Sequence, residues 1–206
     1  MNMNVNIEGV MTAESDIVSG NPLKILVAIS GASGAIYGVR LFQKLQESGH
    51  RVEFIITEYG GEVLRMESNI DPEKLKELAD AVYSDGDLGA APSSGSYRYD
   101  AMVICPCSMS TLSKIAAGIS DTLITRAAAV CLKERRKLII VPRETPLSTI
   151  YLRNMLTLSE SGAVILPPSP GFYHQPESIR EMIDFVVGKI MDSLDIDHTL
   201  FKRWGE

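Results

Sequence analysis

The chain has 206 residues, of which 45% are hydrophobic and 22% charged, as is usual for a globular protein with one core. Its net charge of -6 argues against a general nucleic-acid or anionic-membrane binder. No apolar run reaches the roughly 18 residues that span a bilayer, and residues 1–22 lack the features of a secretory signal. We therefore expect no nucleic-acid partner, no membrane association, a cytoplasmic location, and a loosely ordered extension over 1–22 before one domain over 23–206.

Apolar segments alternate with helical patterns along the chain, which is typical of an α/β protein. Parallel strands need right-handed crossovers, and these place helices on both faces of the sheet. The sequence predicts a doubly wound, mostly parallel sheet in a Rossmann- or flavodoxin-like three-layer sandwich. In chain order we expect a strand over 23–30, a helix over 35–48, a strand over 51–57, helices near 58–67 and 72–82, a long loop over 84–100, a strand over 101–106, a helix over 121–136, a strand over 137–142, a helix over 147–160, a strand over 163–168 and a helix from 176 to about 194.

The first expected strand ends in "SGASGA", residues 30–35, directly before a helix. A helix N-terminus presents unpaired N–H groups and suits an anion. Gly31 and Gly34 allow the backbone to approach a ligand, and Ser33 adds a hydroxyl donor. The spacing matches neither the dinucleotide fingerprint nor a P-loop, so a plain tight turn remains the alternative.

A second turn of this kind lies in "CPCSMSTLSKIAAG", residues 105–118, where Ser108, Ser110 and Thr111 lie between a strand and a helix. Ligands of such sheets bind beyond the carboxyl ends of the strands. Two hydroxyl-rich turns at one edge could hold a phosphate-bearing cofactor, and capping by Ser108 or Ser110 is the simpler alternative. The three cysteines, Cys105, Cys107 and Cys131, are expected to be reduced thiols.

Charged residues follow the fourth expected strand, in "VPRETPLS". Arg143 and Glu144 could bind an anion and move a proton, or form a solvated surface pair. Arg126 and Lys133 are seven residues apart on one expected helix, so they share a face. That face could equally be a surface stripe.

The loop "PPSPGFYHQPESI", residues 167–179, carries Tyr173 and His174. Tyr173 could offer its hydroxyl to an oxyanion or merely pack. For His174 we expect capping or packing rather than general-base catalysis, and we expect His50 and His198 on the surface. The sequence shows neither a Ser-His-Asp set nor a cluster of metal ligands, so we expect no metal and no hydrolase.

Taken together, these segments resemble the flavin prenyltransferases of the UbiX type, over residue 23 to the end of the chain. Several long motifs in the right order make this resemblance far more specific than a single glycine turn. The matching segments are "ISGASGAIYGVRL", "SSGS", "AMVICPCSMSTLSKIAAGISDTLITRAA", "CLKERRKLIIVPRETPLS", "NMLTLSESGAVILPPSPGFYHQP", "FVVGKIMD" and "RWGE".

The resemblance implies that the chain binds FMN and joins the dimethylallyl group of dimethylallyl phosphate to N5 and C6 of the reduced flavin. The product, prenylated FMN, would serve a UbiD-type decarboxylase, with no metal required and a dodecameric assembly. The implied flavin contacts are Gly31, Ala32, Ser33, Thr57, Ser108, Met109, Ser110, Thr111, Arg126 and Arg143. The implied phosphate-end contacts are Lys133, Arg143, Tyr173 and Lys189, and the implied catalytic residues are Ser33, Glu67, Lys133 and Glu144, with Glu144 as the proton carrier.

The chain departs from some relatives at two positions. Lys189 replaces an arginine and loses the bidentate fork, and Leu88 replaces a tryptophan that could shield an allyl cation. Trp204 matches the family and is implied to reach a neighbouring subunit's site.

Two other functions remain open from the sequence. One is FMN-dependent decarboxylation of a cysteine-containing substrate, but relatives of that kind use a histidine after the first helix, and residues 58–70 contain none. The other is a non-catalytic flavin carrier, which would tolerate loss of Glu144 and Lys133, although the chain retains both.

Overall fold

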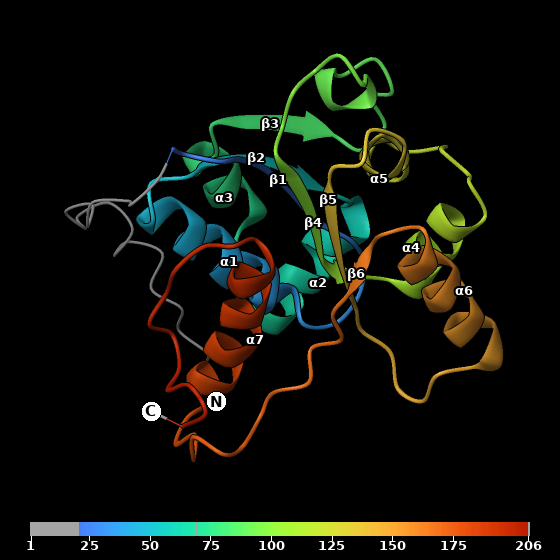
Figure 1. Ribbon diagram of the computed structural model, residues 1–206. Helices are drawn as coiled ribbons and strands as arrows, with labels where there is room; N and C mark the ends of the chain where they lie inside the picture. The colour runs from blue at the N-terminus through green and yellow to red at the C-terminus, as the bar shows by residue number, and fades with distance from the viewer. Residues whose placement is uncertain (1–20, 69, 206) are drawn as a thin grey trace.

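A computed structural model describes residues 21–68 and 70–205 and shows one parallel sheet with helices on both faces (Figure 1). The six strands lie in the order β3-β2-β1-β4-β5-β6, and every neighbouring pair is parallel. The expected doubly wound sandwich is thus confirmed. The strands are β1 (Lys24–Ile29), β2 (Arg51–Ile56), β3 (Ala81–Ser84), β4 (Ala101–Cys107), β5 (Lys137–Pro142) and β6 (Val164–Ile165).

The strand order reverses between β1 and β4, which lie side by side at the centre of the sheet. From β1 the chain first moves outward through β2 and β3, and from β4 it moves outward the other way through β5 and β6. The loops that leave β1 and β4 therefore diverge to opposite faces and open a crevice beyond the carboxyl ends of these strands. This switch point is where a ligand site is expected.

Most helices begin at a residue whose side chain caps the first turn. Asp71 accepts a hydrogen bond from the Glu73 amide at 3.2 Å, with Pro72 at the first helical position, as the sequence predicts. The other capping side chains are Thr57, Ser108, Thr122, Ser148 and Ser178. The helices are α1 (Ala35–Glu47), α2 (Glu58–Ser68), α3 (Pro72–Leu78), α4 (Met109–Ala116), α5 (Leu123–Lys133), α6 (Thr149–Glu160) and α7 (Ile179–Ser193).

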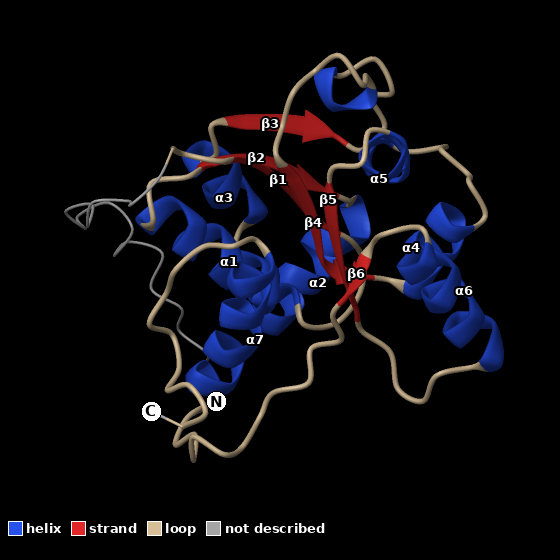
Figure 2. Cartoon of the chain, in the orientation of Figure 1, coloured by secondary structure: helices blue, strands red, loops and turns tan. Residues whose placement is uncertain are grey.

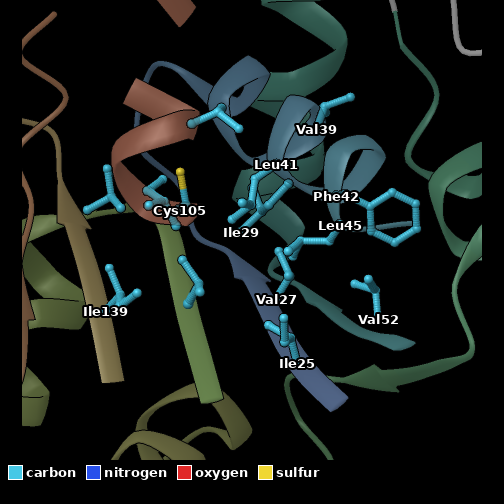
Figure 3. Close-up of a cluster of buried hydrophobic side chains, with 14 of the residues drawn as sticks. Ile25, Val27, Ile29, Val39, Leu41, Phe42, Leu45, Val52, Cys105 and Ile139 are labelled. Atoms are coloured by element: carbon cyan, nitrogen blue, oxygen red, sulfur yellow. The ribbon is translucent and has the colours of Figure 1, made fainter. Parts of the chain in front are cut away.

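Two hydrophobic cores lie on the two faces of the sheet, under the helices that flank it in Figure 2. Alternate residues of β1 serve each core: Ile25, Val27 and Ile29 face α1, α2, α3 and α7, whereas Leu26 and Ala28 face α4, α5 and α6. Figure 3 shows the first of these cores around α1. Each fully buried aliphatic side chain contributes about 1.5–3 kcal/mol, so the central strands hold their carboxyl ends rigidly.

The structure corrects two expected elements. The helix predicted over 72–82 ends at Leu78, and the chain then enters β3, an edge strand whose residues alternate between half-buried and exposed. Helical periodicity hides such a short strand, since only Val82 and Tyr83 have a strong β preference. The strand predicted over 163–168 shortens to β6, because Pro167 and Pro168 cannot donate to a ladder.

Two predictions from the sequence concern residues 1–22 and the membrane. Residues 1–20, most of the expected extension, lie outside the described residues, so this prediction stays untested. Within the described part of the chain, no helix is both long and apolar enough to cross a membrane.

Candidate active site at the carboxyl edge of the sheet

A cavity of about 520 Å³ opens at the carboxyl edge of the sheet. The turn between β1 and α1, the end of α2, the segment after β5, the segment after β6 and the start of α7 form its walls. Its lining residues are Ser33, Gly34, Ile36, Tyr37, Glu67, Pro142, Arg143, Glu144, Thr145, Pro167, Pro168, Ser169, Ile179 and Ile183. Four of the residues predicted for the site, Ser33, Glu67, Arg143 and Glu144, therefore meet in one place.

Glu67 occupies the N-terminus of α1. Its Oε2 accepts hydrogen bonds from the Gly34 amide at 2.8 Å and the Ala35 amide at 3.2 Å. The anion that the sequence predicts at this helix end is thus supplied by the chain itself, from the last turn of α2. Because Glu67 uses the Gly34 and Ala35 amides, a ligand at this turn can bond only to the Ser33 hydroxyl and to the backbone just before Gly34.

Gly31 and Gly34 are required by the shape of the β1–α1 turn. Gly34 has φ of 91°, a left-handed conformation that other residues rarely adopt. A Cβ atom on Gly31 would lie 2.8 Å from the Tyr59 Cβ. The missing side chains therefore let Tyr59 and Tyr37 pack against the turn, and the approach of a ligand to its backbone stays a prediction.

Ser30 joins the two hydroxyl-rich turns. Its Oγ donates to the Pro106 carbonyl at 3.1 Å and accepts from the Ser108 amide at 2.7 Å. The sequence analysis missed this residue, although a buried serine at the end of an apolar strand is the signal that could have found it. The bond holds the start of α4 against the start of α1.

The second turn uses its first hydroxyl as a helix cap. Ser108 accepts from the Thr111 amide at 3.2 Å, and the two side-chain oxygens lie 3.0 Å apart. Capping by Ser108, the simpler alternative, is therefore confirmed. Met109 is buried, whereas Ser110 is exposed. None of the four residues lines the 520 Å³ cavity, so their contact with a flavin stays a prediction.

Arg143 and Glu144 follow β5 and are exposed at the cavity. The backbone at Arg143 is fixed, because its amide donates to the Cys107 carbonyl at 3.2 Å. Glu144 Oε1 accepts from the Thr145 amide at 3.1 Å. Within the described residues neither side chain forms an ion pair, so the Arg143 guanidinium and the Glu144 carboxylate both remain available to a ligand in the cavity.

Tyr37 is a cavity residue that the sequence analysis missed. It lies in the first turn of α1, and its ring packs against Gly34, where a Cβ would be 3.0 Å from the ring. Burial raises the pKa of its phenol, the Cys105 thiol raises it further, and the Arg143 guanidinium lowers it. The hydroxyl therefore stays protonated and can donate a hydrogen bond inside the cavity.

Arg126 and Lys133 lie on α5, on the other face of the sheet from α1 and α7 (Figure 1). Arg126 Nε donates to the Ser93 carbonyl at 3.0 Å, and Lys133 pairs with Glu134. Within one copy of the chain, these two cations do not line the cavity that holds Arg143.

The remaining predicted residues also lie outside the cavity lining. Thr57 Oγ1 accepts from the Gly60 amide at 2.9 Å and so caps α2. Tyr173 is 42% exposed and packs edge-on against Trp204, with ring centroids 5.2 Å apart. Lys189 Nζ lies 3.1 Å from Asp192 Oδ2.

The three histidines have packing roles. The His174 ring stacks on Phe185 with centroids 5.3 Å apart, which confirms the packing expectation. The surface placement of the other two is wrong. His50 is 8% exposed and its Nδ1 accepts from the Leu23 amide at 3.1 Å. The His198 side chain is 3% exposed, and its ring fills the space that a Cβ on Gly188 would need.

Comparison with known proteins decides the family. The model of the family described as Flavoprotein matches residues 14–203. The flavin prenyltransferase UbiX of Thermoplasma acidophilum is 53% identical over 182 residues, which are 88% of this chain and 100% of the relative. The Pseudomonas aeruginosa UbiX is 47% identical over 90% of this chain and 95% of its own length. The chain belongs to the UbiX-type flavin prenyltransferases.

Solved structures of UbiX proteins have the same fold as this chain. AnUbiX (PadA1), in complex with FMN and dimethylallyl pyrophosphate, superimposes with a TM-score of 0.88 at 42% identity, over 90% of this chain and 98% of that one. A dodecameric FMN-dependent UbiX-like decarboxylase from Escherichia coli O157:H7 gives 0.87 at 40% identity, over 89% and 100%. The peptidyl-cysteine decarboxylase EpiD is only 21% identical with a TM-score of 0.56, so this likeness concerns the fold alone.

Proposed function

We propose that this UbiX-type chain joins the dimethylallyl group of dimethylallyl phosphate to reduced FMN and releases prenylated FMN and phosphate. The observation that carries the proposal is a cavity that holds Arg143, without an ion pair in the described chain, together with Glu144, Ser33 and Glu67. Reduced FMN supplies the two ring positions, N5 and C6, to which the prenyl carbons become bonded. The product goes to a UbiD-type decarboxylase.

The residues at the β1–α1 turn fit a flavin. A flat ring needs bare backbone and a donor at its polar edge, and Gly31, Ala32 and Ser33 offer both. The apolar wall of Ile179, Ile183 and three prolines suits the prenyl group and excludes water from an allylic cation. Ser108 to Thr111 and Thr57 hold the polar parts of FMN in this proposal.

Arg143 stabilises the charge that develops on the departing phosphate. Loss of phosphate from an allylic carbon builds negative charge on the phosphate oxygens, and a fixed guanidinium can meet two of them at once. Because no carboxylate of the described chain pairs with this guanidinium, its charge is available to the ligand.

Glu144 moves the proton. In one step its carboxyl group protonates the departing phosphate, and in ring closure its carboxylate accepts the proton from flavin C6. Glu67 has a different task in this proposal, because two backbone amides hold its Oε2. It fixes the β1–α1 turn and so aims Ser33 at the flavin edge.

The assembly completes the site. Lys133, Tyr173 and Lys189, the other proposed phosphate contacts, lie outside the cavity lining of one chain. Exposed apolar side chains on α6 need a partner, among them Ile150 at 66% and Leu156 at 57%. We propose a dodecamer like the E. coli structure, in which neighbouring copies bring these residues to the cavity. The buried, unpaired cysteines fit a reducing cytoplasm.

The direct test is anaerobic incubation of the protein with reduced FMN and dimethylallyl phosphate, followed by mass spectrometry of the flavin. We expect a flavin that gains one five-carbon unit, together with release of inorganic phosphate. A parallel sample with dimethylallyl pyrophosphate shows which ester is used. An unmodified flavin with both esters would contradict the proposal, and loss of carbon dioxide from a cysteine peptide would favour the decarboxylase.

A further inference from the structure

Arg136 connects the long loop 85–100 to the chain just after α5. Its Nη1 donates to the Tyr97 carbonyl at 2.8 Å and its Nη2 to the Gly95 carbonyl at 2.6 Å. Its guanidinium also lies over the Tyr99 ring, 4.7 Å from the centroid. One planar side chain thus contacts two carbonyls and one ring with a fixed fork of donors that a lysine lacks.

The loop is bonded to α5 along the whole helix. At its first turn, Asp85 accepts from the Leu123 amide at 2.7 Å and from the Ile124 amide at 2.9 Å. In the middle, the Tyr99 hydroxyl donates to the Ala127 carbonyl at 3.2 Å. The loop therefore moves with the helix, and Arg136 supplies its last attachment.

The loop backbone at Gly95 lies directly beside the Lys133 side chain. A Cβ on Gly95 would lie 2.6 Å from Lys133 Nζ and closer still to the Glu134 carboxylate. The Lys133 ammonium, which pairs with Glu134, also lies against this bare backbone, so the position of Gly95 limits where the ammonium can lie. The Gly95 carbonyl is itself one of the two groups that Arg136 holds.

We propose that Arg136 is a positioning residue that fixes segment 93–97 on α5 and thereby places the Lys133 ammonium for the phosphate of dimethylallyl phosphate. The inference rests on the proposed function, in which Lys133 binds that phosphate. Arg136 donates to the two loop carbonyls and acts through Lys133. The predicted flavin cation Arg126 shares the segment, since its Nε holds the Ser93 carbonyl.

Arg136→Ala is the primary test. We expect KM for dimethylallyl phosphate to rise about tenfold, with kcat changed less, because a displaced ammonium weakens binding of the phosphate in the ground state and the transition state alike. FMN affinity, measured by quenching of flavin fluorescence, should stay within about twofold. Hydrogen exchange of the amides in 93–97 should accelerate. Arg136→Lys should not rescue KM, because one ammonium cannot hold both carbonyls in a plane.

Two further variants accompany Arg136→Ala, one as a matched control and one as an independent change at the same segment. Arg135→Gly removes the neighbouring arginine, whose φ of 58° glycine adopts freely, and should leave KM and exchange as in the wild type. Gly95→Ala keeps Arg136 but pushes against flexible side-chain ends, so the protein should fold while KM rises as in Arg136→Ala.

A double-mutant cycle with Lys133→Ala decides whether Arg136 acts through Lys133. We expect Arg136→Ala to raise KM no further when Lys133 is already lost. Additive effects would overturn the inference, as would a raised KM in Lys133→Ala together with an unchanged KM in Arg136→Ala. An unchanged KM in Lys133→Ala would overturn both the inference and the proposed role of Lys133, while prenylation by the wild type would still support the proposed reaction.

Discussion

Two groups of charged residues at the sheet differ in burial and in pairing. In the amino-terminal half of β2, the Glu53 carboxylate is 3% exposed and fully partnered. The Tyr97 hydroxyl donates to it at 2.5 Å, the Tyr83 hydroxyl at 3.4 Å, and Lys24 Nζ lies 3.7 Å away. At the carboxyl edge, Arg143 and Glu144 are exposed at the cavity and form no ion pair within the described residues.

The difference separates stability from function. A buried charge with partners supports the fold, because removing one partner leaves the others desolvated and unpaired. A cation without an ion pair contributes little to the stability of the fold and can interact with a bound ligand. Substitutions in the Glu53 cluster should therefore affect unfolding, and substitutions at the carboxyl edge should affect turnover.

Glu144→Gln should have the largest effect. It keeps the shape and the hydrogen bond to the Thr145 amide but removes the transferable proton. We expect kcat to fall about 10³-fold, with unchanged FMN affinity and an unchanged free energy of unfolding in urea. Glu77→Gln, on the exposed face of α3, is the matched control. Wild-type turnover in Glu144→Gln would remove this residue from the mechanism.

Arg143→Ala should have the next largest effect. Without the guanidinium, the departing phosphate loses a fixed cation, and kcat/KM for dimethylallyl phosphate should fall about 100-fold. Stability should change by less than about 0.5 kcal/mol. The rate is followed by phosphate release. A variant with lowered stability and normal kcat/KM would contradict this account, because it would place Arg143 with the residues that stabilise the fold.

Glu53→Gln should have the converse effect. The amide still accepts a hydrogen bond from Tyr97, but the charge that Lys24 and the two phenols support is lost. We expect unfolding to become about 2 kcal/mol easier, with unchanged kcat and KM for the folded protein. Urea denaturation of the flavin-free protein measures this. If turnover fell while stability held, Glu53 would belong with the functional residues.

The smallest effect is a pH dependence of stability from His50. Burial lowers the pKa of its imidazole below 6.5, and its Nδ1 accepts from the Leu23 amide, which requires the neutral ring. The unfolded chain takes up a proton below pH 6.5 and the folded chain does so only at lower pH. The free energy of unfolding should therefore fall as the pH drops below 6.5. His50→Gln should flatten this slope, and an unchanged slope would assign the titration to another group.

The sequence predicts those parts of the molecule that depend on local patterns. Hydrophobic periodicity places the central strands, and the glycine turn places Ser33 at their carboxyl edge. Arg143 and Glu144 directly follow β5, so the rule that ligands bind beyond the carboxyl ends of parallel strands also predicts them at this edge. Glu67 was found only through the family resemblance, because nothing local links it to an amide 33 residues away.

Residues that act through tertiary contacts escaped the sequence analysis. Ser30, Tyr37 and Arg136 lie within matched segments, but the local sequence gives none of them a role. Each gains its role from a partner distant in the chain: the Ser108 amide, the cavity of Arg143, or the carbonyls of the long loop. The sequence near the C-terminus suggests an exposed His198, but its ring is buried because Gly188 has no side chain in the space that the ring occupies.

The central claim is that the carboxyl-edge cavity holds the flavin beside Arg143. A crystal structure of the protein with FMN tests it most directly. We expect the isoalloxazine against the β1–α1 turn, with Ser33 at its N5 edge and Arg143 within hydrogen-bond reach of the ligand. A flavin bound at any other surface, or an empty cavity at saturating FMN, would contradict the account.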